Sequence, residues 1–385
     1  MLIAITAGTI YLQIRKKKQD LRLKRFKLQL EGNPESVDPK KDLKDQVDYI
    51  PYNKKREINR SNFELEEKIG WGNFGNVHKG YIKNLGKEGS QTVVAIKTIQ
   101  KHAKEEDLND LLCEIKLMSR IKPHPNLVSM IGSCHSEYKR SRQLWLLIEF
   151  CEYGDLKKCL FNNKDKIAFG KETDKMNSRY LLMCIYQVAK GMLYLAESRI
   201  MHGDLAARNV LMAEHPLVGE SPIPKIADFG LSKKLYTNER YNKKSRLLVP
   251  WKWMAIEYLT NDFFTLKSDV WSFAVLVWEV LSFGGSPYGQ QSYEDVFEQL
   301  VDKGYRLQCP KEVKLCQVWS PEELYNELTE VCFLTEPEKR ASFSDVIKIL
   351  ETHLSLDEKE SYSKLCDIYD KTKTEKYLAI QKSTR

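Results

Sequence analysis

Two short polar segments restrict the fold of this chain: His202–Asn209 (HGDLAARN) and Asp228–Gly230 (DFG). Asp204 is placed to accept a proton from a hydroxyl group, and Asn209 and Asp228 offer two oxygen ligands of the kind that Mg²⁺ prefers. Transfer of a phosphoryl group depends on positioning and charge neutralisation more than on covalent chemistry. One base beside two metal ligands meets that need, so the two segments indicate a phosphoryl-transfer site.

A glycine-rich segment lies upstream, at Gly70–Val77 (GWGNFGNV). Its glycines let the backbone close over phosphate groups, where a Cβ would collide or exclude the necessary dihedral angles. Alone, this G-x-G-x-x-G-x-V pattern also fits a dinucleotide-binding fold, in which a helix follows, or a hairpin without a ligand. The residues after Gly75 are strand-like, which favours a hairpin that covers phosphates.

Two charged residues lie between these segments. Lys97 ends the run Val94–Lys97 (VAIK) on a predicted strand, where a fixed cation can hold the α- and β-phosphates of a nucleotide. Glu114 lies in a predicted amphipathic helix and can pair with Lys97. Taken singly, Lys97 fits a surface lysine and Glu114 fits a solvated helix face. Because all the elements occur in this order along the chain, they predict a catalytic site.

The hydrophobic pattern changes within the chain. Residues 63–82 and 92–99 alternate apolar and polar positions, and residues 144–150 (LWLLIEF) form another strand-like run. Residues 107–121 carry apolar residues at helical spacing, and the second half is mainly helical to about Leu354. We predict an α+β, two-lobed fold, with a small N-terminal β-sheet lobe that has one helix and a larger, mainly α-helical C-terminal lobe.

From about Phe63 to Leu354 the sequence resembles the eukaryotic protein kinase domain, and within it the receptor tyrosine kinases. Asp204–Asn209 (DLAARN) is similar to the tyrosine-kinase catalytic loop, whereas serine/threonine kinases have Lys where Ala206 stands. Trp251–Ala255 (WKWMA) is similar to the segment that cradles the substrate tyrosine, and the residues before the domain look like the PDGF, VEGF and FGF receptor group. The resemblance implies the protein kinase fold and ATP-dependent phosphorylation of protein tyrosines.

The resemblance also implies roles for individual residues. The catalytic residues that it implies are Asp204 as the base, Arg208, Asn209, Lys97 and Glu114. Asn209 and Asp228 would hold the metal cofactor Mg²⁺, for which Mn²⁺ is an alternative. The residues that it implies for binding ATP are Ile69, Gly70, Trp71, Gly72, Asn73, Phe74, Gly75, Val77, Ala95, Lys97, Glu149, Cys151 and Leu211.

Further positions follow from the same resemblance. Glu257 and Arg340 would form a buried ion pair, and Asp269 would brace the backbone of the catalytic loop. Tyr236 and Tyr241 are candidate phosphotyrosines of the activation loop, although unmodified exposed tyrosines fit the sequence equally well.

The chain divides into four parts. Residues 1–14 are expected to form a partial or short transmembrane or anchor segment, because an apolar run precedes basic residues. Leu2–Ile14 spans roughly 20 Å at ~1.5 Å per residue, less than the ~30 Å hydrocarbon core, so a helix of a soluble protein is the alternative. Residues 15–62 would be a basic juxtamembrane linker with little structure, 63–354 the tyrosine kinase domain, and 355–385 a charged and mostly mobile C-terminal tail.

Charge and cysteine content indicate the surroundings of the protein. The net charge is +8, and the basic cluster at residues 15–27 is suited to anionic lipid headgroups, whereas no nucleic-acid motif is present. Nine scattered cysteines without a C-x-x-C pair indicate reduced thiols in a reducing compartment. We therefore expect a single-pass protein of the cell membrane with a cytoplasmic kinase domain, or alternatively a cytoplasmic protein.

The expected partners are ATP, protein substrates that carry tyrosine, and a membrane, but no nucleic acid. By analogy with the family, a homodimer and phosphotyrosine-binding adaptors are also expected. The tyrosines that adaptors would recognise are Tyr49, Tyr52, Tyr362, Tyr369 and Tyr377.

Two other functions remain open from the sequence. A pseudokinase would use the same fold as an allosteric scaffold; Gly203, which stands where the family usually has Arg, is the one feature in its favour. A serine/threonine or dual-specificity kinase would conflict with the DLAARN and WKWMA segments. The Gly203 departure also predicts a weaker dependence on phosphorylation of the activation loop, because in relatives that Arg binds the phosphorylated loop.

Overall fold

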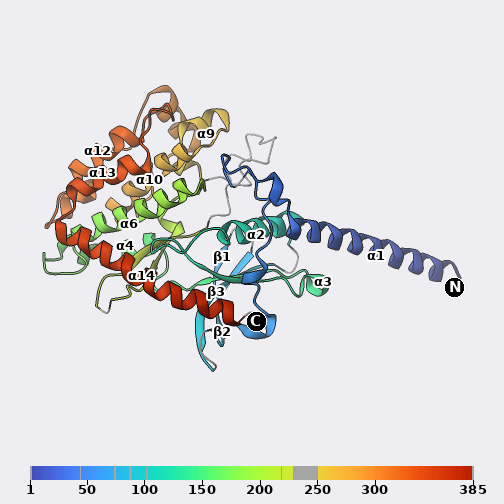
Figure 1. Ribbon diagram of the computed structural model, residues 1–385. Helices are drawn as coiled ribbons and strands as arrows, with labels where there is room; N and C mark the ends of the chain where they lie inside the picture. The colour runs from blue at the N-terminus through green and yellow to red at the C-terminus, as the bar shows by residue number, and fades with distance from the viewer. Residues whose placement is uncertain are drawn as a thin grey trace.

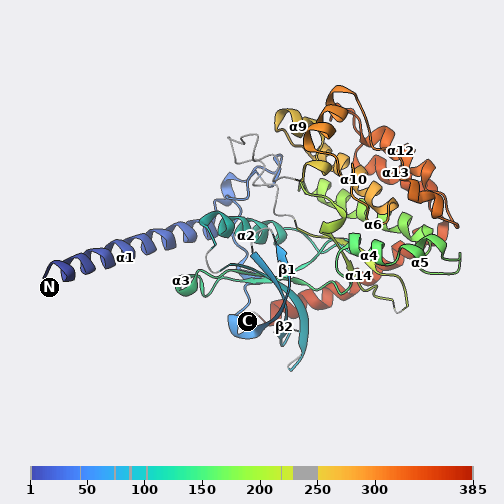
Figure 2. The ribbon, with the colours of Figure 1, turned by 180° about the vertical axis from the view of Figure 1, so that it is seen from behind.

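The computed structural model describes residues 2–43, 45–72, 75–85, 89–100, 103–217, 219–228 and 250–383. Figure 1 shows a β-sheet lobe and a larger helical lobe, as the sequence predicts, and Figure 2 shows the same arrangement from behind. The N-terminal part of helix α1 (Leu2–Glu31) projects away from both lobes, whereas its C-terminal end packs against the small lobe.

The smaller lobe is a five-stranded antiparallel sheet in the order β1-β2-β3-β5-β4. Successive residues of β3 point to opposite faces, so Val94 and Ile96 pack on one side while Ala95 joins the core that contains Leu111 and Ile115 of α2. The elements are β1 (Phe63–Gly72), β2 (Gly75–Lys83), β3 (Gln91–Ile99), α2 (Glu105–Met118), β4 (Met130–Cys134), α3 (Tyr138–Ser141) and β5 (Trp145–Glu149).

The larger lobe is built around α6 (Ser178–Glu197) and α10 (Leu266–Leu281). Both helices are apolar around most of their circumference, as expected for helices at the centre of a lobe. The remaining elements are α4 (Leu156–Asn162), α5 (Lys164–Phe169), β6 (Val210–Ala213), β7 (Ile223–Ile226), α9 (Ile256–Asn261), α11 (Tyr293–Phe297), a π-helical turn (Glu298–Asp302), α12 (Glu322–Cys332), α13 (Phe343–His353) and α14 (Leu356–Ser383).

The segment between α1 and the sheet packs against the small lobe, although its composition predicted little structure. Val47 and Ile50 are buried against Cys113 and Leu117 of α2. The Lys116 ammonium donates a hydrogen bond to the carbonyl oxygen of Val47 at 3.3 Å. A few apolar side chains thus hold this polar segment, because their partners lie together on one face of α2.

Helix α1 runs through the boundary that the sequence analysis placed between the anchor segment (1–14) and the linker (15–62). It contains the apolar run and continues through the basic cluster to Glu31. In the described part of the chain, no helix has both the length and the apolar content that a membrane span requires.

The C-terminal residues form the helix α14 rather than the mobile tail that their charge predicted. Tyr362 and Leu365 are buried, and the Tyr362 hydroxyl donates to Asn126 Oδ1 at 3.0 Å. Arg179 at the start of α6 donates to Glu358 at 2.7 Å. Figures 1 and 2 show α14 running along the large lobe to the sheet. A short stripe of buried residues at helical spacing, Tyr362 and Leu365, therefore packs this otherwise charged helix against the large lobe.

Loss of that stripe should release α14. Leu365→Asp places an unpaired carboxylate in an apolar contact, which is strongly unfavourable, so we expect amide hydrogen exchange across residues 356–383 to become at least about tenfold faster. Leu356→Asp makes the same change at a residue that is 77% exposed and should leave the exchange unchanged. Equal protection in both variants would contradict the docked position of α14.

Candidate active site

The glycine-rich hairpin lies directly over the predicted phosphate-binding lysine. Gly72 at the end of β1 pairs with Gly75 at the start of β2, and Val77 pairs with Lys97 of β3. A Cβ on Gly75 would lie 2.0 Å from the carbonyl oxygen of Thr98, so only glycine fits there. Of the predicted loop residues, Asn73, Phe74 and the side chain of Trp71 lie outside the described part of the structure.

Lys97 connects the sheet, α2 and the DFG segment. Its Nζ donates to Glu114 Oε1 at 2.6 Å and also pairs with Asp228 Oδ1. Glu114 is buried on α2, and its Oε2 atom has no hydrogen-bond partner within the described residues. Three charges that the sequence predicted as separate members of one site are thus in direct contact.

The pKa values of this cluster reflect burial and mutual attraction. Burial would lower the pKa of Lys97, but Asp228 and Glu114 outweigh it and raise that pKa. Burial, together with the nearby Asp228, raises the pKa of Glu114 against the opposing effect of Lys97. Burial would raise the pKa of Asp228, but Lys97, with smaller contributions from His202 and Arg208, outweighs it and holds that pKa below the ordinary value. The cluster therefore presents a fixed ammonium and an ionised Asp228 to the cleft.

The predicted catalytic loop, residues 202–209, is held by Asp269 of α10, as the resemblance implied. One oxygen of Asp269 accepts the backbone N–H of His202 at 2.7 Å, and the other accepts that of Gly203 at 2.9 Å. His202 Nε2 donates to the carbonyl oxygen of Ala227 at 2.9 Å and so ties the loop to the residue before Asp228. Gly203 has φ +78°, a conformation that glycine adopts without strain.

Asp204 is the buried acid of the loop. Arg208 donates to Asp204 Oδ1, and Asn209 Nδ2 donates to Asp204 Oδ2 at 2.7 Å. Burial raises the pKa of Asp204 to about 6, against the opposing effects of Arg208 and Asn209. The carboxylate is thus ionised at neutral pH yet basic enough to accept a proton, which suits a general base.

The rate should follow the ionisation of Asp204. Because the base must be deprotonated and its pKa is raised to about 6, kcat/KM should rise with pH through that value and level off above it. Arg208→Gln removes a charge that lowers this pKa, so the midpoint should move to higher pH. Initial rates of peptide phosphorylation between about pH 5 and 8 measure both midpoints, and an identical midpoint in both proteins would contradict this assignment.

Asn209 and Asp228 have the oxygen atoms that a divalent cation requires. Since Nδ2 of Asn209 is committed to Asp204, its Oδ1 atom remains as an acceptor. Asp228 has φ +62°, which is uncommon for a residue other than glycine and frequent at ligand-binding positions. The donor set of one amide and one carboxylate oxygen fits Mg²⁺, and Mn²⁺ accepts the same ligands.

Glu279, a residue that sequence reasoning missed, supports the loop together with Trp253 of the WKWMA segment. Glu279 of α10 accepts the backbone N–H of Ala207 and the indole N–H of Trp253, both at 2.8 Å. The Arg208 guanidinium lies over the Trp253 ring, 4.3 Å from its centroid. A signal was available, because Glu279 is an acid within an otherwise apolar helical run.

The predicted adenine-contacting residues are only partly brought together. Ala95 is buried in the main hydrophobic core, and Val77 and Leu211 are partly buried against the same core, whereas Ile69 is 46% exposed. Glu149 is expected to contact adenine through its backbone, and its side chain accepts the Ser129 N–H at 2.6 Å and pairs with Lys225.

The remaining predicted site residues are Cys151, Tyr236 and Tyr241. Cys151 is buried two residues after the end of β5, and its backbone makes no hydrogen bond within the described residues, which leaves its N–H and C=O for a ligand. Tyr236, Tyr241, Phe229 and Gly230 lie outside the described residues.

Comparison with known proteins gives consistent matches. The sequence profile of the family described as protein tyrosine and serine/threonine kinase matches residues 63–350. The myoblast growth factor receptor egl-15 of Caenorhabditis elegans is 32% identical over 78% of this chain and 29% of the relative. Fibroblast growth factor receptor 1 of Pleurodeles waltl is 33% identical over 81% and 37%, and the angiopoietin-1 receptor of Danio rerio is 36% identical over 78% and 25%. The chain thus spans about a third of the length of the curated relatives it matches.

Proposed function

Because this chain belongs to the protein tyrosine and serine/threonine kinase family, we propose that it transfers the γ-phosphoryl group of ATP to tyrosine hydroxyls of other proteins, with Asp204 as the base. The membership confirms the predicted kinase fold, and the receptor tyrosine kinase relatives support the predicted class of enzyme, an ATP-dependent protein tyrosine kinase. The observation that carries the residue assignment is the Asp204 carboxylate held by Arg208 and Asn209, together with the contact of Lys97 with Glu114 and Asp228.

The side chains divide the work of one displacement reaction. The tyrosine oxygen attacks the γ-phosphorus, the bond to the β-phosphate oxygen breaks, and Asp204 takes the hydroxyl proton. Arg208 and Asn209 fix the direction of the Asp204 carboxylate. Lys97, itself oriented by Glu114, offers its ammonium to the α- and β-phosphates.

Asn209 and Asp228 would hold the divalent cation, which neutralises phosphate charge when it is bound. The residues predicted for adenine binding, from Ile69 on β1 to Leu211 on β6, belong to the same proposal.

Removal of the lysine charge should abolish most of the activity. Lys97→Met leaves Glu114 and Asp228 without their cation, so we expect kcat/KM to fall by about 10²–10³. Lys83→Met, at an exposed lysine of β2, should have no effect. The measurement is phosphate incorporation into a tyrosine polymer. A scaffold that never used ATP for transfer would show the same signalling output before and after the Lys97 change.

Phosphoamino-acid analysis tests the choice of acceptor. We expect only phosphotyrosine when a mixed set of tyrosine, serine and threonine peptides is offered to the purified chain with ATP and Mg²⁺. Phosphoserine or phosphothreonine in comparable yield would favour the dual-specificity alternative and refute the role of the DLAARN and WKWMA segments.

We also propose that the chain is the cytoplasmic part of a single-pass receptor that signals across the cell membrane. The relatives are named as receptors, and in α1 an apolar run precedes the basic residues 15–18. Dimerisation and adaptor binding belong to the same proposal. Among the tyrosines suggested for adaptors, Tyr49 is exposed, whereas Tyr52 and Tyr362 are buried and would need local opening. A cytoplasmic location remains the alternative, which fractionation of cells that express the full-length protein would separate from the first.

A further inference from the structure

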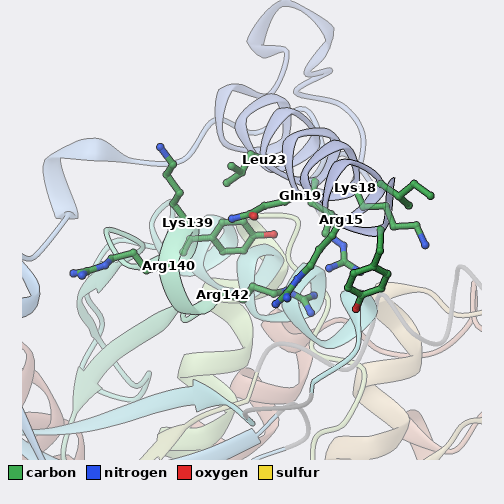
Figure 3. A pocket seen from close by; sticks show the side chains of 11 residues that line it. Arg15, Lys18, Gln19, Leu23, Lys139, Arg140 and Arg142 are labelled. Atoms are coloured by element: carbon green, nitrogen blue, oxygen red, sulfur yellow. The ribbon is translucent and has the colours of Figure 1, made fainter. Parts of the chain in front are cut away.

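A basic pocket lies between helix α1 and the short helix α3 of the small lobe. Its volume is about 370 Å³, within the size range of small-molecule sites. Figure 3 shows that side chains of both elements surround it. Its six basic residues are Arg15, Lys18, Arg22, Lys139, Arg140 and Arg142. Neither element forms this site alone, because three of the cations come from α1, two from α3 and one, Arg142, from the residue that follows α3.

Contacts at the C-terminal end of α1, beyond the residues that line the pocket, hold the helix against the small lobe. The Phe26 ring stacks on Tyr138 of α3, with a centroid distance of 3.5 Å and an interplanar angle of 9°. Gln29 Nε2 donates to Asn109 Oδ1 of α2 at 2.9 Å, and the Tyr52 N–H donates to the carbonyl oxygen of Leu30 at 2.8 Å. The spacing of the two basic elements is therefore set by the fold.

The positive charge of the pocket is largely uncompensated. Glu105 accepts from Arg142 Nη2 at 2.7 Å, and within the described residues no other acid pairs with any of the six cations. Arg142 Nε is buried without a hydrogen-bond partner, and Arg142 has φ +58°, a conformation in which glycine is favoured. A buried donor without an acceptor is unfavourable, so an anionic ligand would stabilise this arrangement.

We propose that this pocket binds the phosphorylated inositol ring of a membrane phosphoinositide. Arginine forks bind phosphate oxygens in pairs, and several cations around one space favour a ligand that carries several phosphates. The position along α1 favours the lipid over a free sugar phosphate. Arg15 and Arg22 lie about 1.5 and 12 Å along the helix from Ile14, where the apolar run ends, which overlaps the headgroup layer of about 5–8 Å.

The inference that the pocket binds an anion depends only on the pocket. The inference that this anion is a lipid headgroup also depends on the proposed function, which places the chain at the membrane. Occupation of the pocket would fix the small lobe close to the membrane surface, since three of the ligating residues belong to the β4–β5 connection. It would also place the ligand beside Glu105, the first residue of the helix that carries Glu114.

The test compares two double variants of the full chain that change charge equally. Lys139→Glu/Arg140→Glu alters the α3 side of the pocket, whereas Lys24→Glu/Lys27→Glu alters exposed residues of α1 that do not line it. Calorimetry with soluble inositol 1,4,5-trisphosphate measures the site. Vesicle flotation tests whether the ligand is a lipid. It compares phosphatidylcholine vesicles that contain phosphatidylinositol 4,5-bisphosphate with vesicles that contain phosphatidylserine of equal total charge. Tyrosine kinase activity of each variant is recorded separately, so a failed pocket and a failed enzyme are distinguishable.

We expect the α3 variant to lose at least tenfold in affinity for the soluble headgroup, and the α1 control to lose less than about threefold. We also expect the wild type to prefer the phosphoinositide vesicles. Equal losses in both variants, or no headgroup binding by the wild type, would overturn the site. Headgroup binding without a vesicle preference would overturn the lipid source and assign the pocket to a soluble polyphosphate.

Discussion

Asp204→Asn is expected to lower kcat for tyrosine phosphorylation by a factor of about 10²–10⁴, the usual contribution of a general base. The amide has nearly the shape of the carboxylate but cannot take the tyrosine proton. Asn209 Nδ2 also donates to the backbone carbonyl of Asp204 at 2.7 Å, so the loop keeps one of its ties after the change. The loss should therefore appear in kcat, with little change in KM for ATP.

The matched control is Asp302→Asn, which makes the same change at an exposed residue far from the cleft in sequence. It should retain full activity. If Asp204→Asn also retained activity while remaining folded, the base would have to be another group and the mechanism described above would be wrong.

The second large effect concerns stability. Arg340 is fully buried and forms two hydrogen bonds of 3.0 Å with Glu257, in agreement with the ion pair that the resemblance implied. Arg340 also donates to the carbonyl oxygens of Leu334 and Lys267, and Glu257 accepts from Ser268. Arg340→Met would leave a buried carboxylate without its cation, so we expect the free energy of unfolding to fall by about 3–5 kcal/mol.

Urea denaturation measures this change. The neighbouring Lys339→Met removes an exposed lysine that pairs with Glu336 and should change the midpoint little. The Glu257→Gln/Arg340→Met double variant should lose less than the sum of the two single changes, because neither charge is then left alone. Strict additivity would show that the two side chains act independently.

The sequence was sufficient for the core of the site because each member has a local signal. Lys97 follows a strand-like run and Glu114 lies on an amphipathic helix, and the structure joins them as predicted. The helix begins at Glu105 and ends at Met118, against the predicted 107–121. Asp269 on α10 and Arg340 in the turn between α12 and α13 were found through the resemblance, since a charged residue gives no local sign of its distant partner.

The structure of the segments that flank the kinase domain could not be predicted, because each is held by a few contacts with residues that are distant in the sequence. Val47 and Ile50 are isolated apolar residues until α2 supplies Cys113 and Leu117. The stripe of α14 is similarly short within a charged helix, and the pocket beside α3 needs residues more than a hundred positions apart. Composition alone describes such segments as linkers.

The measurement that tests the central claim most directly is transfer of phosphate from ATP to poly(Glu,Tyr) by the purified chain with Mg²⁺. We predict steady incorporation on tyrosine that the Asp204→Asn variant loses. Tight ATP binding without any transfer by the wild-type chain would contradict this account and identify the protein as a pseudokinase.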